Sequence, residues 1–112
     1  MLRGYYAHME SRSPSPAAVE LGVLLKEGRF AAAVSPLSAA TVLNVPLDSL
    51  LNIEHGNEDP FLEALVCREG WIDPLIQLYE LDAMSGARLK RAKARLREEL
   101  NAKAAWRRSR PH

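Results

Sequence analysis

The sequence predicts an all-α fold, and three observations lead to this prediction. Leu and Ala dominate the 112 residues and β-branched residues are sparse, which favours helices over strands. Apolar residues recur at spacings of three and four along most of the chain, as on one face of a helix. Pro16, Pro36, Pro60 and Pro74 each follow a capping or turn residue, which is typical of helix starts. We therefore expect a compact bundle of five helices with an additional C-terminal helix.

The first helix is expected to begin with Ser15 as N-cap and Pro16 at its first helical position, and to run to about Ala33. One face of it is apolar or small: Leu21, Leu24, Leu25, Gly28, Ala31 and Ala32. Glycine inside a helix costs roughly 1 kcal/mol relative to alanine. Gly28 therefore indicates that another helix approaches closely at this point.

The second helix should cover residues 35–43, and Asn44 should follow it in a turn, because asparagine tolerates positive φ. The third helix should start near Pro46 and end at Gly56. Asp48 falls in its first turn, where the helix dipole favours a carboxylate. Its apolar surface is predicted to consist of Leu47, Leu50, Leu51 and Ile53.

Three further helices complete the predicted bundle. The fourth opens with Asp59-Pro60 and stops before Gly70, and the fifth opens with Asp73-Pro74. The sixth runs from about Ser85 to Ala105 and is charged except for a narrow apolar stripe of Leu89, Ala92, Leu96 and Leu100. This stripe fits three alternatives: packing on the domain, pairing with a second copy, or binding a partner.

Charge divides the chain into segments. Residues 1–14 are expected to be a flexible N-terminal segment, residues 15–82 a helical domain, and residues 83–112 a basic C-terminal helix and tail. Residues 1–82 carry five basic and twelve acidic side chains, a net charge of about −7. Residues 83–112 carry ten basic and two acidic side chains, a net charge of +8. The basic segment therefore either seeks polyanions or folds against its own acidic domain.

Several function classes are not indicated. No apolar run is long enough to span a bilayer and nothing marks export, and the single cysteine, Cys67, suits a reducing compartment, so a cytoplasmic protein is expected. We expect Cys67 to be a small buried residue. No metal, cofactor or enzymatic activity is expected. The chain lacks a glycine-rich phosphate loop, its neighbouring Glu98 and Glu99 point apart on a helix, and its histidines have no ligand spacing: His8, His55 and His112.

The spacing of residues Leu21 to Leu65, and more loosely to Leu81, resembles the Xre/Cro/lambda-repressor-type helix-turn-helix family. Positions that match fall in four successive helices: Leu21, Gly22, Leu25, Glu27 and Arg29; Ser35, Ala40, Leu43 and Val45; Leu50, Ile53, Glu54 and Gly56; Pro60, Leu62, Glu63 and Leu65. The resemblance implies a lambda-repressor-like bundle of about five helices. It also implies a partly buried ion pair between Arg29 and Glu54. Residues 70–82 followed by the basic tail are similar to a bacterial subset of this family.

The resemblance implies that the third helix enters the major groove of double-stranded DNA. Its residues Leu47, Asp48, Ser49, Asn52 and His55 would then face the bases or the sugar-phosphate edge. Asparagine reads adenine best, and an aspartate accepts from a cytosine amino group. Phosphate contacts would come from the tail: Arg88, Lys90, Arg91, Lys93 and Arg95.

Two departures from the family fall where DNA contacts are expected. Pro36 stands where the family usually has a glutamine that contacts the DNA backbone. No Arg or Lys occurs between Arg29 and Arg68, although phosphate neutralisation supplies most of the affinity in ordinary DNA binding.

Two hypotheses follow. The first is a transcriptional regulator of the Xre type, a repressor or activator that binds a palindromic operator as a homodimer. The second is an antitoxin-like protein-interaction module on the same scaffold, whose acidic domain and leucine stripe bind a toxin, a polymerase subunit or another regulator. In either case one apolar group forms core or a dimer surface: Trp71, Ile72, Leu75 and Tyr79.

Overall fold

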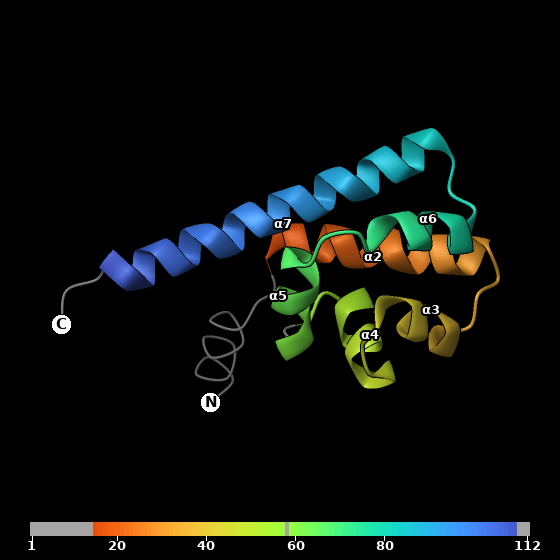
Figure 1. Cartoon of the computed structure of the whole chain (residues 1–112), viewed down its shortest axis with the longest axis horizontal. Coiled ribbons are helices and arrows are strands. Elements are labelled where there is room, and N and C mark those ends of the chain that lie inside the picture. Colours follow the sequence, from red (N-terminus) through yellow and green to blue (C-terminus); the bar gives the residue numbers. More distant parts are fainter. Residues whose placement is uncertain (1–14, 58, 110–112) are drawn as a thin grey trace, which may run out of the picture.

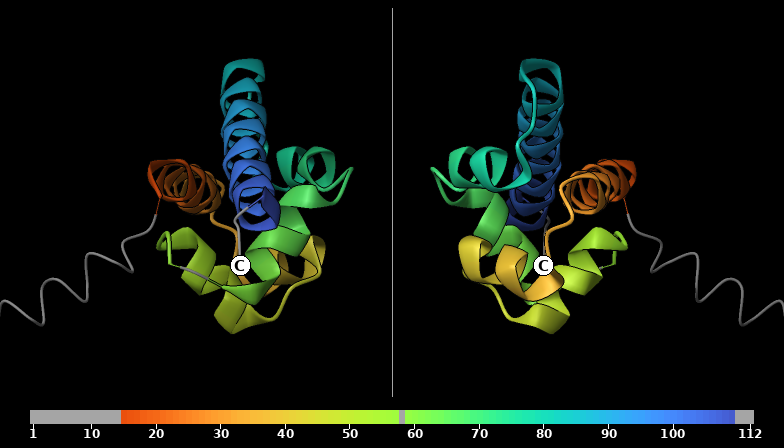
Figure 2. Two further views of the ribbon diagram at one scale, coloured as in Figure 1. Left: turned by 90° about the vertical axis from the view of Figure 1, so that its left-hand side faces the viewer. Right: turned by 90° about the vertical axis from the view of Figure 1, so that its right-hand side faces the viewer.

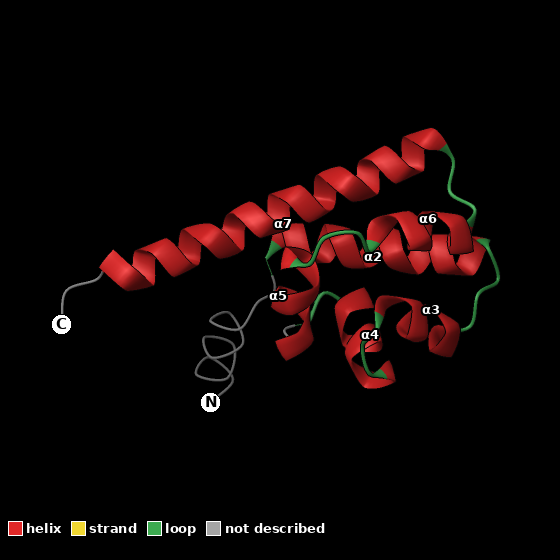
Figure 3. Ribbon diagram, viewed as in Figure 1, coloured by secondary structure: helices red, strands yellow, loops and turns green. Residues whose placement is uncertain are grey.

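The computed structural model describes residues 15–57 and 59–109, with side chains described up to residue 105. These residues form six helices and no strand (Figures 1 and 3): α2 (Pro16–Ala31), α3 (Pro36–Leu43), α4 (Leu47–Glu54), α5 (Pro60–Cys67), α6 (Ile72–Tyr79) and α7 (Ala83–Ser109). The predicted all-α class is confirmed. The expected flexible segment, residues 1–14, lies outside the described residues.

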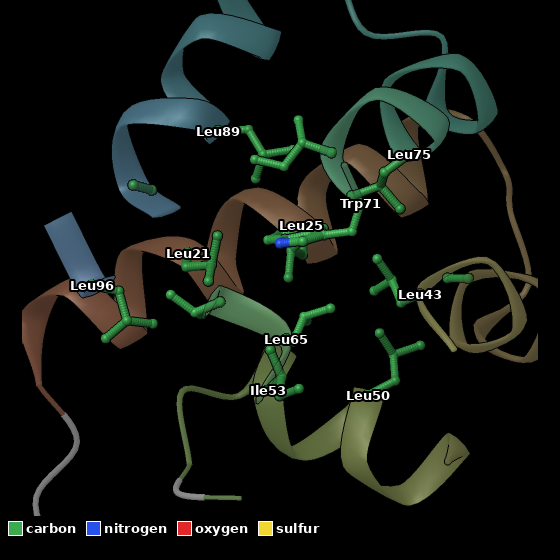
Figure 4. Packing of buried hydrophobic residues seen from close by; sticks show 14 of the residues in the cluster. Leu21, Leu25, Leu43, Leu50, Ile53, Leu65, Trp71, Leu75, Leu89 and Leu96 are labelled. Carbon is green, nitrogen blue, oxygen red and sulfur yellow. The ribbon is translucent and has the colours of Figure 1, made fainter. Parts of the chain in front are cut away.

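Helix α2 packs most extensively against α7 and α4. Helices α3 and α4 lie on one side of α2 and α7 crosses the other side, with α5 and α6 between these two layers (Figures 1 and 2). Leucines from all six helices meet in one core, together with Ile53 and Trp71 (Figure 4). The first and the last described helices, α2 and α7, thus pack against each other although they are far apart in the sequence.

The predicted caps explain where three helices begin. Ser15 Oγ accepts a hydrogen bond from Ala18 N at 3.0 Å, and Ser35 Oγ accepts one from Ser38 N at 3.1 Å. Asp59 Oδ1 accepts one from Phe61 N at 2.8 Å. Each acceptor satisfies one of the N–H groups that a helix leaves free in its first turn.

Two helices begin earlier than predicted. Helix α6 starts at Ile72 with Trp71 as N-cap, so Asp73 and Pro74 lie inside its first turn. A proline is tolerated there because the first-turn N–H groups have no intrahelical partner, and the shift allows Trp71 to be buried. Helix α7 starts at Ala83, because Asp82 Oδ1 accepts from Ser85 N at 2.7 Å.

The structure explains why asparagine occupies position 44 and glycine occupies positions 22 and 28. Asn44 ends α3 with φ +59°, as predicted. A Cβ atom at Gly28 would lie 2.8 Å from the Tyr79 ring, which confirms the close approach expected there. The sequence did not predict a tighter contact at Gly22, where a Cβ atom would lie 2.4 Å from Ile53 O. Helix α4 therefore rests its last turn directly on the backbone of α2.

The basic C-terminal helix folds back onto the acidic domain. Leu89, Ala92 and Leu96 are buried in the same core as α2, and Leu100 is partly buried against it. Of the three alternatives for the leucine stripe, packing on the domain is the one observed. None of the described helices is both long and apolar enough to cross a membrane.

Candidate functional site

Helix α4 divides into a packed face and an outward face. Leu50, Ile53 and Glu54 are buried against α2 and α3, whereas Leu47 and Asp48 are exposed. Because successive residues turn by about 100° around a helix, the outward face also includes His55, with Leu51 and Asn52 half-buried at its edge. This outward face is the candidate site, since it holds four of the five residues predicted to contact DNA.

Ser49, the fifth of these residues, does not lie on the outward face. Its residue exposure is only 6%. The physical reason is the helix period, which places Ser49 next to Leu50 and Ile53 on the packed face. Ser49 is therefore part of the surface that packs α4 onto the domain.

Asp59 connects the candidate site to α5. Asn52 Nδ2 donates to Asp59 Oδ2 at 3.1 Å, while Asp59 Oδ1 caps α5. Burial opposes ionisation of this carboxyl, but the hydrogen bonds from Phe61 N–H, Asn52 and Ser49 outweigh burial and lower the pKa of Asp59. The bond fixes the Asn52 amide, whose oxygen accepts no hydrogen bond from residues 15–57 or 59–105. Sequence reasoning assigned Asp59 only a capping role and missed this contact.

The predicted ion pair between Arg29 and Glu54 is present at the inner side of α4. Arg29 Nε donates to Glu54 Oε2 at 2.8 Å and Arg29 Nη2 donates to Glu54 Oε1 at 3.0 Å. The side chains are 8% and 1% exposed, respectively, so the pair is buried. The hydrogen bond with Glu54 raises the pKa of Arg29. A bidentate pair of this kind fixes orientation as well as distance, and it ties the last turn of α4 to α2.

Helices α2 to α5 carry several exposed apolar side chains, and α3, α4 and α5 contain no cation. Phe30 is 62% exposed, Leu37 63%, Phe61 42% and Leu47 38%. No Lys or Arg belongs to α3, α4 or α5. Arg68, the first cation after α5, donates a guanidinium N–H to the carbonyl oxygen of Leu43. The neighbourhood of α4 therefore offers few groups that neutralise phosphate.

The five cations predicted to contact the DNA backbone lie elsewhere. They belong to α7, on the side of the molecule opposite α3 and α4 (Figures 1 and 2). Within the described residues Arg95 pairs with Glu20 at 2.8 Å and Lys90 with Asp73 at 3.7 Å, while Lys93 Nζ lies 5.8 Å from the Trp71 ring centre. Arg88 and Arg91 are exposed. These cations consequently face away from any duplex that the α4 of the same chain enters.

Two other expectations are resolved by burial. Cys67 is exposed, so the prediction of a buried cysteine is wrong. Leu65 and Val66 form the packed face of the last turn of α5, and the next residue points about 100° away from it. The apolar group Trp71, Ile72, Leu75 and Tyr79 belongs to the core, which leaves it unavailable as a dimer surface.

No protein-family model, curated protein or solved structure matches this chain. Within residues 15–57 and 59–109, no cluster of three or more His, Cys, Asp or Glu side chains is placed to hold a metal ion. The interpretation of the candidate site therefore depends on the geometry of α3, α4 and α7.

Proposed function

We propose that this chain is a sequence-specific DNA-binding transcriptional regulator of the Xre/Cro/lambda-repressor type, with α3 and α4 as its helix-turn-helix unit. One observation carries the proposal. A three-residue turn joins α3 to α4, and α4 is seated on α2 by its inner face so that its outer face points to solvent. A helix held in this way can enter the major groove, which is about 12 Å wide.

In the proposed mechanism the outer face of α4 reads base edges. Asn52, held by Asp59, presents its amide oxygen and its other N–H to an adenine. Asp48 accepts a hydrogen bond from a cytosine amino group, and Leu47 packs on a thymine methyl. Two copies bind the half-sites of a palindromic operator about one helical turn apart. The bound dimer then blocks the promoter for polymerase or recruits polymerase to it, without a cofactor.

The lack of Lys and Arg in α3 and α4 sets a condition on this proposal. The salt dependence of affinity follows the number of phosphates neutralised by Lys and Arg, with a slope of about −0.9 per phosphate. Because α3 and α4 contain neither residue, their contacts to phosphate come from N–H and hydroxyl groups. Site-selective binding through α4 should therefore depend only weakly on salt.

The test is selection of binding sites from a random DNA pool with the full-length protein, followed by titration of the selected site. Truncation near Asp82 is unsuitable because it removes Leu89, Ala92 and Leu96 from the core. Asn52→Ala should weaken binding to the selected site by roughly 5- to 150-fold, the effect of losing a bidentate base contact worth about 1–3 kcal/mol. The exposed Gln77→Ala on α6 serves as a matched control. Failure to select any sequence at low salt would remove the proposal.

A second candidate function is a protein-interaction module, in which the same face binds a toxin or another regulator. The observation that favours it is the exposure of one large apolar side chain on each of α2, α3, α4 and α5, namely Phe30, Leu37, Leu47 and Phe61. Exposed apolar side chains of this kind are enriched at protein contact surfaces. Pull-down from native extract distinguishes the two candidates. A stoichiometric protein partner that is lost in Leu37→Ser, with no retained DNA, would favour this module.

A further inference from the structure

Helix α7 forms a ridge on the side of the molecule opposite α4. Among residues 83–98 only Gly86, Leu89, Ala92 and Leu96 are buried, so more than half of the helix circumference is exposed. In the end-on views of Figure 2, α7 projects above its two neighbours, with α2 on one side of it and α6 on the other. Its 27 residues extend about 40 Å at 1.5 Å per residue, and its C-terminal end projects beyond the rest of the bundle (Figure 1).

Cations lie along both flanks of this ridge. On the α2 side, Arg95 reaches Glu20, and Arg88 lies two turns earlier on the same flank. On the other side, Lys90 reaches Asp73 at the start of α6, and Arg97 reaches Glu69 in the preceding loop at 3.1 Å. Between the flanks the outward line of α7 consists of Ala87, Arg91, Ala94 and Glu98, all exposed. Two cationic rows thus flank a line formed in part by alanines.

We propose that α7 is a second DNA-binding element, which enters the major groove of a duplex other than the one that α4 would contact. An α-helix with its side chains is about 10–12 Å across and the major groove is about 12 Å wide. Alanine side chains let the helix approach the groove floor closely, and the two cationic rows then face the phosphates of the two strands. Glu98, the acid on the outward line, can accept a hydrogen bond from a cytosine amino group.

The chemistry of the ridge favours double-stranded DNA over other polyanions. A helix that lies in a membrane interface needs large apolar residues on its buried face, and the outward line of α7 offers alanines there. The major groove of double-stranded RNA is deep and too narrow for side chains to read. Only DNA combines a dense phosphate charge with a groove of helix width.

The existing ion pairs do not prevent this contact. The pairs of Lys90, Arg95 and Arg97 are exposed, with cation side-chain exposures of 60%, 59% and 44%. Exposed pairs contribute about 0–1 kcal/mol, so these cations can exchange a carboxylate for a phosphate at little cost. Arg88 and Arg91 make no ion pair with any described residue. The α7 contact does not depend on base reading by α4; if both occur, one chain bridges two duplexes.

The test measures binding of full-length protein to a random-sequence 20-base-pair duplex by fluorescence anisotropy over a series of salt concentrations. Arg88→Gln/Arg91→Gln removes two exposed cations from α7. Arg88 belongs to a row that faces phosphates, so its loss should reduce the steepness of log K against log[salt] by about 0.9 and lower affinity at 0.1 M salt by roughly 8-fold. Arg91 lies on the outward line, and its loss should lower affinity further. The control Ala64→Glu/Gln77→Glu makes the same net charge change at exposed positions of α5 and α6, and should retain the wild-type slope.

A further measurement locates the contact. Because the random-sequence duplex carries no selected site, a failure of α4 to select a sequence is separable from a failure of α7 to bind. Duplex methylated at guanine N7, which lies in the major groove, should bind more weakly than unmodified duplex. The proposal is overturned if the Arg88/Arg91 variant keeps wild-type affinity and slope, if methylation has no effect, or if the protein binds anionic phosphatidylserine vesicles and not the duplex.

Discussion

Helix α2 holds α4 on one side and α7 on the other, and it does so by different means. Toward α4 the contact is backbone against backbone at Gly22, supported by the buried pair of Arg29 and Glu54. Toward α7 the contact consists of leucine side chains, with an exposed pair between Glu20 and Arg95 at its edge. The first contact has little freedom to adjust, whereas the second can repack.

This difference has a consequence for function. A helix that reads base edges must keep its side chains within about 0.5 Å of the productive geometry, and the α2–α4 contact provides such a constraint. A helix that binds phosphates through long cationic side chains tolerates larger displacements, because Lys and Arg adjust by rotamer changes. The two contacts therefore suit sequence reading by α4 and charge-based binding by α7.

The largest expected effect is at the α2–α4 contact. Glu54→Ala leaves Arg29 buried without its carboxylate, and breaking a buried pair in this way costs about 3–5 kcal/mol. The free energy of unfolding in urea should fall by this amount. The double variant Arg29→Met/Glu54→Leu, which removes both charges, should be distinctly more stable than Glu54→Ala. Equal losses in the single and double variants would contradict the role assigned to the pair.

The next effect is at the α2–α7 contact. Leu96→Ala removes a buried leucine that packs α7 onto the domain, and such substitutions cost about 2–5 kcal/mol. Thermal or urea unfolding measures the loss, with the exposed Ala94→Ser as a control that should cost no more than its difference in helix propensity, below about 0.7 kcal/mol. If Leu96→Ala left the free energy of unfolding unchanged, α7 would not be part of the folded domain in solution.

A pair of glycines compares the rigidity of the two regions directly. Gly22→Ala places a Cβ atom against the carbonyl oxygens of Ile53 and Glu54, where the backbone must move, so a net cost of about 1–3 kcal/mol is expected. Gly86→Ala in α7 instead meets the end of the Ile76 side chain at 3.1 Å. That side chain can shift, and alanine is the better helix former by about 1 kcal/mol, so stability should change little or rise. Urea unfolding curves of the two variants and the wild type measure both changes in the free energy of unfolding.

Local rules made the helix pattern predictable, whereas contacts between distant residues were mostly not. Ser15, Ser35 and Asn44 act through groups a few residues away, so their roles could be inferred from sequence. Gly28 indicated a close contact but not its partner, Tyr79, because the local sequence does not show which helices pack against each other.

The candidate site was predictable in its position but not in its orientation. The resemblance indicated residues 47–55 and the Arg29–Glu54 pair, yet Ser49 faces inward because the rotation of α4 about its axis is set by packing on α2. The position of α7 could not be predicted, because its leucine stripe fits the domain, a second copy or a partner equally well. Only the core shows that Leu89 and Leu96 complete the domain.

A smaller effect is expected at the edge of the α2–α7 contact. Arg95→Gln removes the exposed pair with Glu20, and exposed pairs contribute about 0–1 kcal/mol. The free energy of unfolding should fall by no more than this, and the difference from wild type should vanish in 1 M salt, where the Debye length is about 3 Å. A loss above 2 kcal/mol would mean that charge, rather than the leucine stripe, holds α7.

The smallest expected effect is a loss of stability at low pH. It compares two N-cap carboxyls, Asp59 next to α4 and Asp82 at the start of α7. Hydrogen bonds lower the pKa of Asp59, despite the opposing effect of burial, and a hydrogen bond from Ser85 N–H lowers the pKa of Asp82, both from an ordinary 3.8. A carboxyl with a lowered pKa stabilises the fold above the pKa of the unfolded chain, and this contribution is lost as pH falls through the folded value. Stability should therefore decline as pH falls below about 4.

Asparagine at either position keeps an N-cap acceptor but cannot titrate. Asp59→Asn and Asp82→Asn should each make the free energy of unfolding fall less steeply between pH 5 and pH 2 than it does in the wild type. The change should be greater for Asp59, whose carboxyl is partly buried and accepts hydrogen bonds from both α4 and α5, than for the exposed Asp82. Equal acid profiles for the two variants would mean that the link from Asn52 to Asp59 adds nothing beyond the cap itself.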